Sequence, residues 1–267
     1  MVPFIEAPVD PFPALRGRFE AHLRACIDQE QRAEPPEARL AWRLSRYDNG
    51  LKLLALARAL GVKVETATVL DAGGAFGGDV LPFAASGATA LVTDWLDHHF
   101  AALTAFAERE GLKIGTFPAD AMHLPLREAS VDLVLSLDVV EHLPDVHLFA
   151  GEVARVLKPD GVALVTTPPR WRFLARDPHY GVPLLHALPM SWREPVARRV
   201  FGSAYPYAVY RIYGSAKEAA APFECHGLKV EAMMPFSEGA ERWRQRMPTQ
   251  MFAWLQSYAW DILIVRP

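Results

Sequence analysis

The chain has 267 residues, of which 51% are hydrophobic and 22% charged, a composition typical of a folded globular protein and not of a disordered one. Its net charge of -3 argues against a dedicated nucleic-acid-binding protein, so we expect no nucleic-acid partner. The two cysteines lack metal-type spacing, which excludes a disulfide scaffold and a cysteine zinc site and favours a reducing, cytoplasmic location.

Residues 1–65 are expected to form an N-terminal arm and helices that precede the main domain. The first 13 residues include four prolines and therefore predict an extended arm. Apolar residues at helical spacing predict helices over residues 16–31 and 37–60, separated by a breaker at residues 34–37. A turn signal at Asp48–Gly50 leaves open whether the second segment is one helix or two. No apolar run reaches membrane-spanning length, so we expect a soluble protein.

From about residue 66, short apolar runs alternate with longer amphipathic segments, a pattern typical of strand-helix units around a parallel sheet. Strands are predicted at residues 67–71, 90–94, 113–117, 131–137 and 162–167. Helices are predicted between them at residues 77–86, 98–110 and 145–157. Asp145 is the expected N-cap of the last helix, and residues 158–161 are expected to form its closing turn. This rhythm predicts a Rossmann-like, doubly wound α/β fold.

The segment VLDAGGAFGGD, Val69–Asp79, joins the first predicted strand to the next helix. Glycine loses the most backbone freedom on folding, so four glycines here indicate that the backbone must approach another group closely. A glycine-rich turn alone is a weak signal, because close strand-helix packing also requires one. The second strand ends in Asp94, 23 positions after Asp71, about the spacing at which nucleotide-binding sheets place an acid against a ribose diol. The alternative role for Asp94 is a helix cap.

Asp71 separates the strand from the first glycine, so the turn has the order D-x-G-x-x-x-G and not the G-x-G-x-x-G of nicotinamide folds. A carboxylate is unfavourable beside a pyrophosphate, but it suits a ligand with a cationic amino acid end. S-adenosylmethionine is such a ligand, with an amino group for the Asp71 region and a ribose diol for Asp94. An NAD(P)-dependent Rossmann oxidoreductase is the alternative that Asp71 disfavours.

Five segments in order resemble the class I S-adenosylmethionine-dependent methyltransferases, especially the methyltransferase type 11 group, similar to ubiquinone and menaquinone biosynthesis enzymes. They are VLDAGGAFGG, ALVTD, ADAMHLPL, SVDLVLSLDVVEHL and EVARVLKPDGVALVTTP, and together they span residues 69–168. The predicted cofactor is S-adenosyl-L-methionine. The predicted cofactor-binding residues are Asp71, Gly73, Gly74, Gly77, Asp94, Trp95, Asp120, Ala121, Met122 and Leu137.

The resemblance implies a role for several of these residues. In the family, the acid at Asp120 meets the adenine amino group, the main chain of Ala121 and Met122 contacts the ring edge, and Leu137 lies beside the methionine part. Trp95 is a candidate to stack on adenine, with simple packing as the alternative. One departure is Ala75, since the family has glycine there, and it puts the affinity for the cofactor in question.

Methyl transfer requires mainly that the acceptor atom be held in line with the methyl carbon, and it requires a base only where the acceptor must lose a proton. His142 and His179 are the predicted catalytic residues, with His186 as a further candidate. The alternative for His142 is a structural histidine. We assign no metal ligand, although a comparable acid and histidine hold a metal in some quinone-pathway relatives, which leaves Glu141 and His142 as an open alternative.

Residues 66–267 are expected to form the methyltransferase core, with a substrate-facing lid insertion at residues 168–214. Strands at residues 228–236 and 258–267, with a helix over 238–255, complete the family's seven-stranded sheet, whose last strand is antiparallel. Seven arginines face two acids in the insertion, which favours a small-molecule or lipid-linked acceptor, anionic in character, or contact with an anionic membrane. The alternative is that these arginines only solvate the outer surface of a folded lid. Four aromatic residues of the insertion are predicted to line a pocket or to pack: Trp171, Tyr180, Trp192 and Tyr205.

The sequence thus predicts an S-adenosylmethionine-dependent methyltransferase that acts on a small-molecule, lipid-linked or sugar-containing acceptor, at oxygen. The alternatives are the oxidoreductase and a non-catalytic S-adenosylmethionine-binding protein. The sequence leaves the identity of the acceptor and the oligomeric state open.

Overall fold

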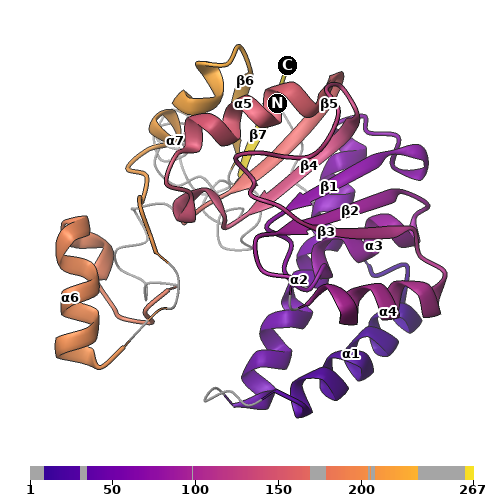
Figure 1. Ribbon diagram of the computed structural model, residues 1–267, viewed down its shortest axis with the longest axis horizontal. Coiled ribbons are helices and arrows are strands. Elements are labelled where there is room, and N and C mark those ends of the chain that lie inside the picture. Colours follow the sequence, from indigo (N-terminus) through magenta and orange to yellow (C-terminus); the bar gives the residue numbers. More distant parts are fainter. Residues whose placement is uncertain are drawn as a thin grey trace, which may run out of the picture. The chain divides into compact units, whose positions relative to one another are not determined.

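A computed structural model describes residues 9–30, 35–97, 99–168, 179–203, 205, 208–233 and 262–267 (Figure 1). The α-helices are α1 Pro13–Asp28, α2 Pro36–Ala59, α3 Leu81–Ala85, α4 Phe100–Glu110, α5 Val146–Val156, α6 Met190–Phe201 and α7 Ala216–Glu224. The strands are β1 Thr68–Ala72, β2 Thr89–Asp94, β3 Ile114–Pro118, β4 Val131–Leu137, β5 Leu157–Thr166, β6 Lys229–Met233 and β7 Ile262–Arg266. Short 3-10 turns are η1 Val64–Thr66, η2 Gly78–Val80, η3 Val140–His142 and η5 Leu185–Ala187.

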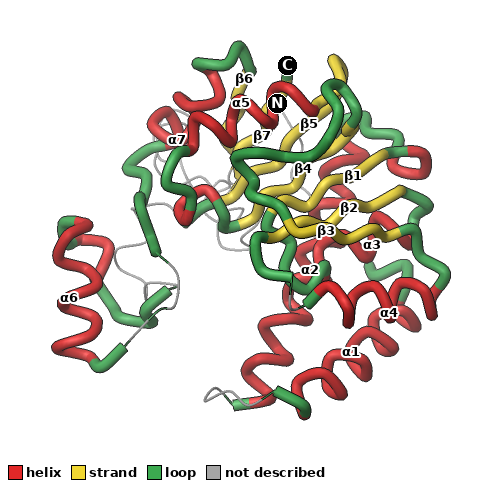
Figure 2. Tube along the Cα trace, in the orientation of Figure 1, coloured by secondary structure: helices red, strands yellow, loops and turns green. Residues whose placement is uncertain are grey.

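The strands form a seven-stranded sheet in the order β3-β2-β1-β4-β5-β7-β6, drawn in yellow in Figure 2. β1 is parallel to β2 and β4, and β2 is parallel to β3. β7 is antiparallel to both of its neighbours, β5 and β6. The predicted Rossmann-like α/β class with an antiparallel last strand is therefore confirmed. The strand order reverses at β1, and ligands of open α/β sheets bind at the carboxyl ends of the strands beside such a switch point.

The chain divides into two compact units, one built from residues 1–135 with 156–162 and the other from residues 136–155 with 163–267. In the first unit, α1 packs against α2 and α4. The apolar residues that the sequence spaces at helical intervals are buried together there. This core includes Leu15, Phe19, Leu23, Ile27, Leu40, Tyr47, Leu51, Leu81 and Phe106.

The segment that contains the Asp48–Gly50 turn signal is a single helix, α2, which answers the question that the sequence left open. Gly50 lies inside this helix because a Cβ atom at that position would collide with the main-chain carbonyl of Asp79. Asp48 in turn accepts two hydrogen bonds from the Arg16 guanidinium, at 2.9 and 3.1 Å. The glycine thus marks the close approach of two backbones and not a chain reversal.

In the second unit, α5 begins as the sequence predicts. The Asp145 carboxylate accepts hydrogen bonds from the main-chain N–H groups of His147 and Leu148, at 2.9 and 3.3 Å. Phe149 of α5 packs edge-on against Phe223 of α7, with ring centroids 6.2 Å apart. Residues 158–161, predicted as a turn, belong to the first part of β5, so this strand is longer than its apolar run indicates.

Some predicted features lie outside the described residues. They are the N-terminal arm up to residue 8, the helix at residues 238–255, and residues 169–178 of the insertion, which include Trp171 and three of its arginines. Within the described ranges, no helix is both long enough and apolar enough to cross a membrane.

Candidate active site

The turn after β1 requires glycine at position 74, because the Asp71 side chain lies directly against the backbone there. A Cβ atom at position 74 would lie 2.5 Å from Asp71 Oδ2 and 2.7 Å from Val92 Cγ1, so only glycine fits there. The main-chain N–H groups of Gly73 and Gly74 donate to the Thr93 carbonyl, at 2.7 and 3.1 Å, which ties the turn to the end of β2. Gly73, Gly77 and Ala75 all have positive φ, and Ala75 is the one that carries a side chain.

Asp71 is a buried acid in β1, directly before this turn. The residue is 1% exposed, and its Oδ2 atom has no hydrogen-bond partner. Burial raises the pKa of Asp71 well above its usual value, and the neighbouring charges of Asp79 and Asp94 raise this pKa further, whereas Arg46 lowers it. An unsatisfied buried carboxyl is costly unless a cation or a donor arrives to meet it. The position is therefore suited to a cationic ligand.

Asp94 ends β2 and supports the glycine turn directly. Its carboxylate accepts hydrogen bonds from the main-chain N–H groups of Ala75 and Leu96, at 3.2 and 3.1 Å. A carboxylate has about four lone-pair positions, so two hydroxyl groups can still bind to it. The neighbouring Trp95 is 71% exposed and so is not core packing.

Asp120 lies beyond β3, in a short turn that starts beside Asp94. The Ala119 N–H donates to the Asp94 carbonyl at 3.1 Å. Asp120 Oδ1 accepts from the Met122 N–H at 2.9 Å, and Oδ2 lies 3.2 Å from His123 Nδ1. These contacts fix the turn that holds the predicted residues Ala121 and Met122. No motif in the sequence indicates this role for His123.

Helix α2 contributes groups to the glycine turn that no sequence motif predicts. Arg46 donates to Asp79 Oδ2 at 2.7 Å, and the Asp79 side chain is 1% exposed. The Arg43 guanidinium lies 3.6 Å from the centroid of the Phe76 ring, and the His99 ring lies 3.5 Å from the same ring. Helix α2 therefore buries the turn from one side. The sequence signal for this packing is Gly50, a glycine inside a helical segment.

In the second unit, Leu137 ends β4 in a buried position, and Asp138 follows with a positive φ of 59°. Hydrogen bonds with Thr166 hold Asp138 in this conformation. The Asp138 N–H donates to the Thr166 carbonyl, and the Thr166 hydroxyl donates to Asp138 Oδ1, each at 3.1 Å. The chain then enters η3, which carries Glu141 and His142.

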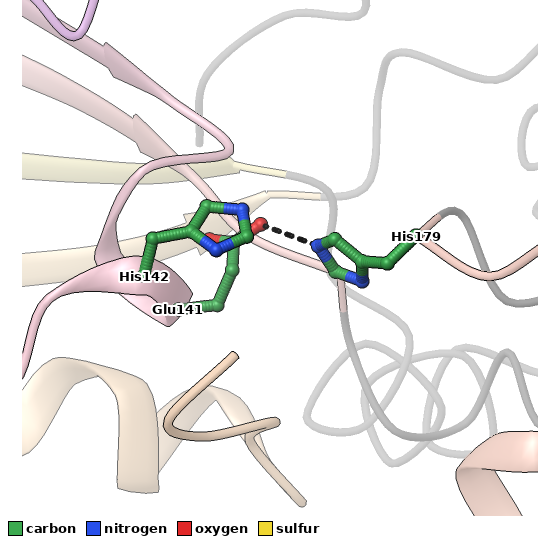
Figure 3. A group of neighbouring side chains, drawn as sticks. All are labelled: Glu141, His142 and His179. Carbon is green, nitrogen blue, oxygen red and sulfur yellow. Dashed lines mark ion pairs between the residues drawn. The ribbon is translucent and has the colours of Figure 1, made fainter. Parts of the chain in front are cut away.

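The two histidines predicted to be catalytic, His142 and His179, are brought together in this unit (Figure 3). Their rings are 5.0 Å apart and nearly perpendicular, and the Tyr205 ring contacts both. Glu141, which the sequence analysis left as an alternative, completes the group: its Oε1 atom lies 3.7 Å from His179 Nε2. His186 lies in η5, and its side chain is outside the described parts of the chain.

Residues 70–165 match the model of a protein family described as "Methyltransferase domain". A Mycolicibacterium smegmatis protein described as an S-adenosylmethionine-dependent methyltransferase is 54% identical over 50 residues, 19% of this chain and 20% of that protein. The ubiquinone biosynthesis O-methyltransferase of Rickettsia conorii is 28% identical over 123 residues, 46% of this chain and 42% of the enzyme. The chain thus covers less than half of the length of either relative.

The fold has solved counterparts. The crystal structure of an S-adenosylmethionine-dependent methyltransferase from Mesorhizobium loti aligns with a TM-score of 0.51 at 18% sequence identity, over 80% of this chain and 96% of that one. At this identity, the likeness concerns the fold alone.

Proposed function

We propose that the protein is an S-adenosylmethionine-dependent methyltransferase that transfers a methyl group to a hydroxyl oxygen of a small-molecule or lipid-linked acceptor. The match of residues 70–165 to a methyltransferase domain, and the relatives described as methyltransferases, support this proposal. The observation that carries the proposal is the buried, unsatisfied carboxyl of Asp71 against the bare backbone of Gly74. This arrangement fits the cationic methionine end of S-adenosylmethionine. It opposes a dinucleotide, whose pyrophosphate would add negative charge beside Asp71, Asp79 and Asp94.

The residues of the first unit fit the rest of the cofactor in the same way. We assign the ribose diol to Asp94, whose carboxylate keeps acceptor capacity after its two main-chain hydrogen bonds. We assign the adenine amino group to Asp120 and the ring edge to the main chain of Ala121 and Met122. The exposed indole of Trp95 is available to stack on the adenine ring. From the family resemblance, Leu137 is assigned to the methionine part.

Bound S-adenosylmethionine supplies an activated methyl group on a sulfonium and leaves as S-adenosylhomocysteine. The protein must then orient the acceptor and exclude water. A hydroxyl acceptor also has to lose its proton as the new C–O bond forms. We assign the removal of this proton to the group of Glu141, His142 and His179. Oxygen as the methylated atom is supported by the O-methyltransferase among the relatives.

Helix α6 supports an anionic or lipid-linked acceptor. Trp192, Val200 and Phe201 expose more than half of their side-chain surface on this helix, which also carries the exposed Arg198 and Arg199. Apolar side chains next to arginines are typical of surfaces that touch anionic lipid. Flotation with phosphatidylglycerol vesicles, compared with phosphatidylcholine vesicles, tests this contact. Equal binding to both kinds of vesicle, or to neither, contradicts it.

The activity is tested by incubating the full chain with methyl-labelled S-adenosylmethionine and fractionated metabolite and lipid extracts. We expect release of S-adenosylhomocysteine and one labelled product whose label is on oxygen. Calorimetry with S-adenosylmethionine and with NADH separates the proposal from the oxidoreductase. Binding of S-adenosylmethionine without transfer to any extract would instead identify a non-catalytic binding protein.

A further inference from the structure

Glu141, His142 and His179 meet in the second unit from two places in the chain. Glu141 and His142 are neighbours on η3, whereas His179 comes from the insertion, beyond the residues that match the family. Figure 3 shows the carboxylate and the two rings turned toward one another. Each residue offers one ligand atom, and these three atoms lie within 4.8 Å of one another.

The Glu141 carboxylate is the observation that needs an explanation. Its side chain is 0% exposed, and neither of its oxygens has a hydrogen-bond partner. Its main chain is held, because the Glu141 carbonyl accepts from the Tyr210 N–H at 2.8 Å. A carboxylate withdrawn from water with no donor is among the costliest groups that a fold can contain. A cation bound between its oxygens and the two imidazoles removes this cost.

The His142 ring is oriented as a ligand. Its Nδ1 atom lies 2.8 Å from the carbonyl oxygen of Ala208, and a carbonyl only accepts, so Nδ1 carries the proton. Nε2 therefore carries the lone pair in the neutral ring. A main-chain carbonyl that fixes the tautomer in this way is the usual support of a metal-binding histidine.

We propose that Glu141, His142 and His179 form a binding site for a divalent transition-metal ion. Zinc bonds to nitrogen and oxygen are about 2.0–2.2 Å long, so two ligand atoms at a tetrahedral angle are about 3.4 Å apart. The 3.7 Å between Glu141 Oε1 and His179 Nε2 is close to this spacing, and the three ligand atoms, which lie within 4.8 Å of one another, must move closer together to share one ion. One carboxylate and two imidazoles select zinc, iron or cobalt over magnesium or calcium. Three protein ligands leave a coordination position open for a further oxygen.

The alternative is a Glu-His pair in which His179 acts as a general base and binds no metal ion. A base of this kind is oriented by a hydrogen bond from its ring to the carboxylate, but 3.7 Å exceeds hydrogen-bond length. The pair also gives no reason for the orientation of His142 toward the same carboxylate. The metal site accounts for all three residues together.

The consequence for catalysis rests on the proposed function. A metal ion in contact with an acceptor hydroxyl lowers the pKa of that hydroxyl. The proton then passes to solvent, the C–O bond forms, and the S–CH3 bond breaks with the electron pair staying on sulfur. In this form, His142 and His179 act as metal ligands and not as bases.

Metal binding is measured without any acceptor or cofactor. The full chain is stripped with a chelator and titrated with Co²⁺, with detection of the visible absorption band of the bound ion, and with Zn²⁺ in competition against a chromogenic chelator. We expect one ion per chain. We expect Glu141→Gln and His179→Gln to weaken binding at least ~100-fold, because each removes a ligand, an effect at the upper end of that seen for losing a supporting partner. His147→Gln, on the exposed face of α5, is the matched control and keeps wild-type affinity.

Two results would overturn the proposal: a wild-type chain that takes up no cobalt or zinc, or a His179→Gln chain that binds as tightly as the wild type. Circular dichroism of each variant shows that it is folded, and His142→Gln is the second ligand variant if Glu141→Gln is not. The affinity of the metal-free chain for S-adenosylmethionine is measured separately. A chain that does not bind S-adenosylmethionine either with or without the metal ion would count against the proposed function and not against the metal site.

Discussion

Asp71 Oδ2 lies so close to the backbone of Gly74 that a Cβ atom at position 74 would be only 2.5 Å from this oxygen. Any side chain at position 74 would therefore collide with Asp71. The acid and the glycine therefore depend on each other. We predict that Gly74→Ala weakens the binding of S-adenosylmethionine at least ~100-fold, about 2.7 kcal/mol, because Asp71 must move. Isothermal titration calorimetry measures this affinity. Ala75→Gly is the control, since the positive φ of Ala75 suits glycine, and its affinity should equal or exceed that of the wild type.

The raised pKa of Asp71 predicts that binding of S-adenosylmethionine is coupled to proton release. The ligand-free protein holds Asp71 protonated above the usual pKa of an aspartate, whereas a cationic ligand favours the ionised form. The affinity should therefore rise with pH until Asp71 is ionised without the ligand. Calorimetry in buffers of different ionisation enthalpy counts the released proton. In Asp71→Asn, this released proton should disappear.

The same group makes the ligand-free protein less stable as the pH rises. Between the usual pKa of aspartate, about 3.9, and the raised pKa in the fold, the folded chain binds more protons than the unfolded chain, so the free energy of unfolding falls with pH. We predict that Asp71→Asn has a flatter dependence in this window. Urea unfolding at a series of pH values measures it. An identical slope in the variant would show that another group is responsible.

The Asp94 carboxylate is predicted to be essential for binding and dispensable for folding. Asp94→Ala removes the proposed acceptor for the ribose diol and two main-chain hydrogen bonds at the edge of the sheet. We expect no measurable affinity for S-adenosylmethionine and an unchanged circular dichroism spectrum. Asp97→Ala, three residues later on an exposed position, is the matched control. Tight binding by the Asp94→Ala protein would contradict our assignment of the diol.

The Arg46–Asp79 pair predicts a large loss of stability when one partner is removed. Arg46→Met leaves the Asp79 carboxylate buried without its 2.7 Å ion pair, which should cost about 3–5 kcal/mol in the free energy of unfolding. On the same helix, the exposed Arg58–Glu65 pair is the control, and Arg58→Met should lower the free energy of unfolding far less, because water screens an exposed pair. Urea unfolding compares the two. Similar losses would mean that the buried pair does not hold α2 to the turn.

His142→Gln and His179→Gln are predicted to lower turnover by about 100-fold and to leave the affinity for S-adenosylmethionine unchanged, because each weakens the group that promotes loss of the acceptor proton, either directly or through the proposed metal ion. Single-turnover kinetics and calorimetry separate the two quantities. His147→Gln provides the reference rate. A wild-type rate in either variant removes that histidine from the catalytic group.

Much of the fold was predictable because its signals are local. Apolar runs between residues 68 and 137 mark strands within a residue or two of their ends, and Asp145 caps α5 as its sequence indicates. The boundary of β5 was wrong because residues 158–161 contain turn-forming residue types but are extended in the sheet. A sheet neighbour overrides a local preference of this kind.

The site was predictable only where a motif places its residues. The glycine turn, Asp94 and Asp120 follow from their positions at strand ends. The pairing of Arg46 with Asp79 spans 33 residues, and no spacing rule connects a helix to a turn at that distance. Likewise, the approach of His179 to Glu141 depends on how the insertion folds, which the charge and aromatic content of its sequence do not specify.

The packing of α2 on the glycine turn determines the shortest fragment of this protein that can bind the cofactor. The region shared with the family begins at residue 70, yet Asp79 packs against Gly50 and forms an ion pair with Arg46, and both of these residues lie before that region. A fragment that starts at residue 70 would lack Arg46, the ion-pair partner of Asp79. It would also expose to water the apolar residues that pack against α1 and α2, such as Leu81 and Phe106. Truncation from the amino end should therefore abolish ligand capture long before it removes any residue that touches the ligand.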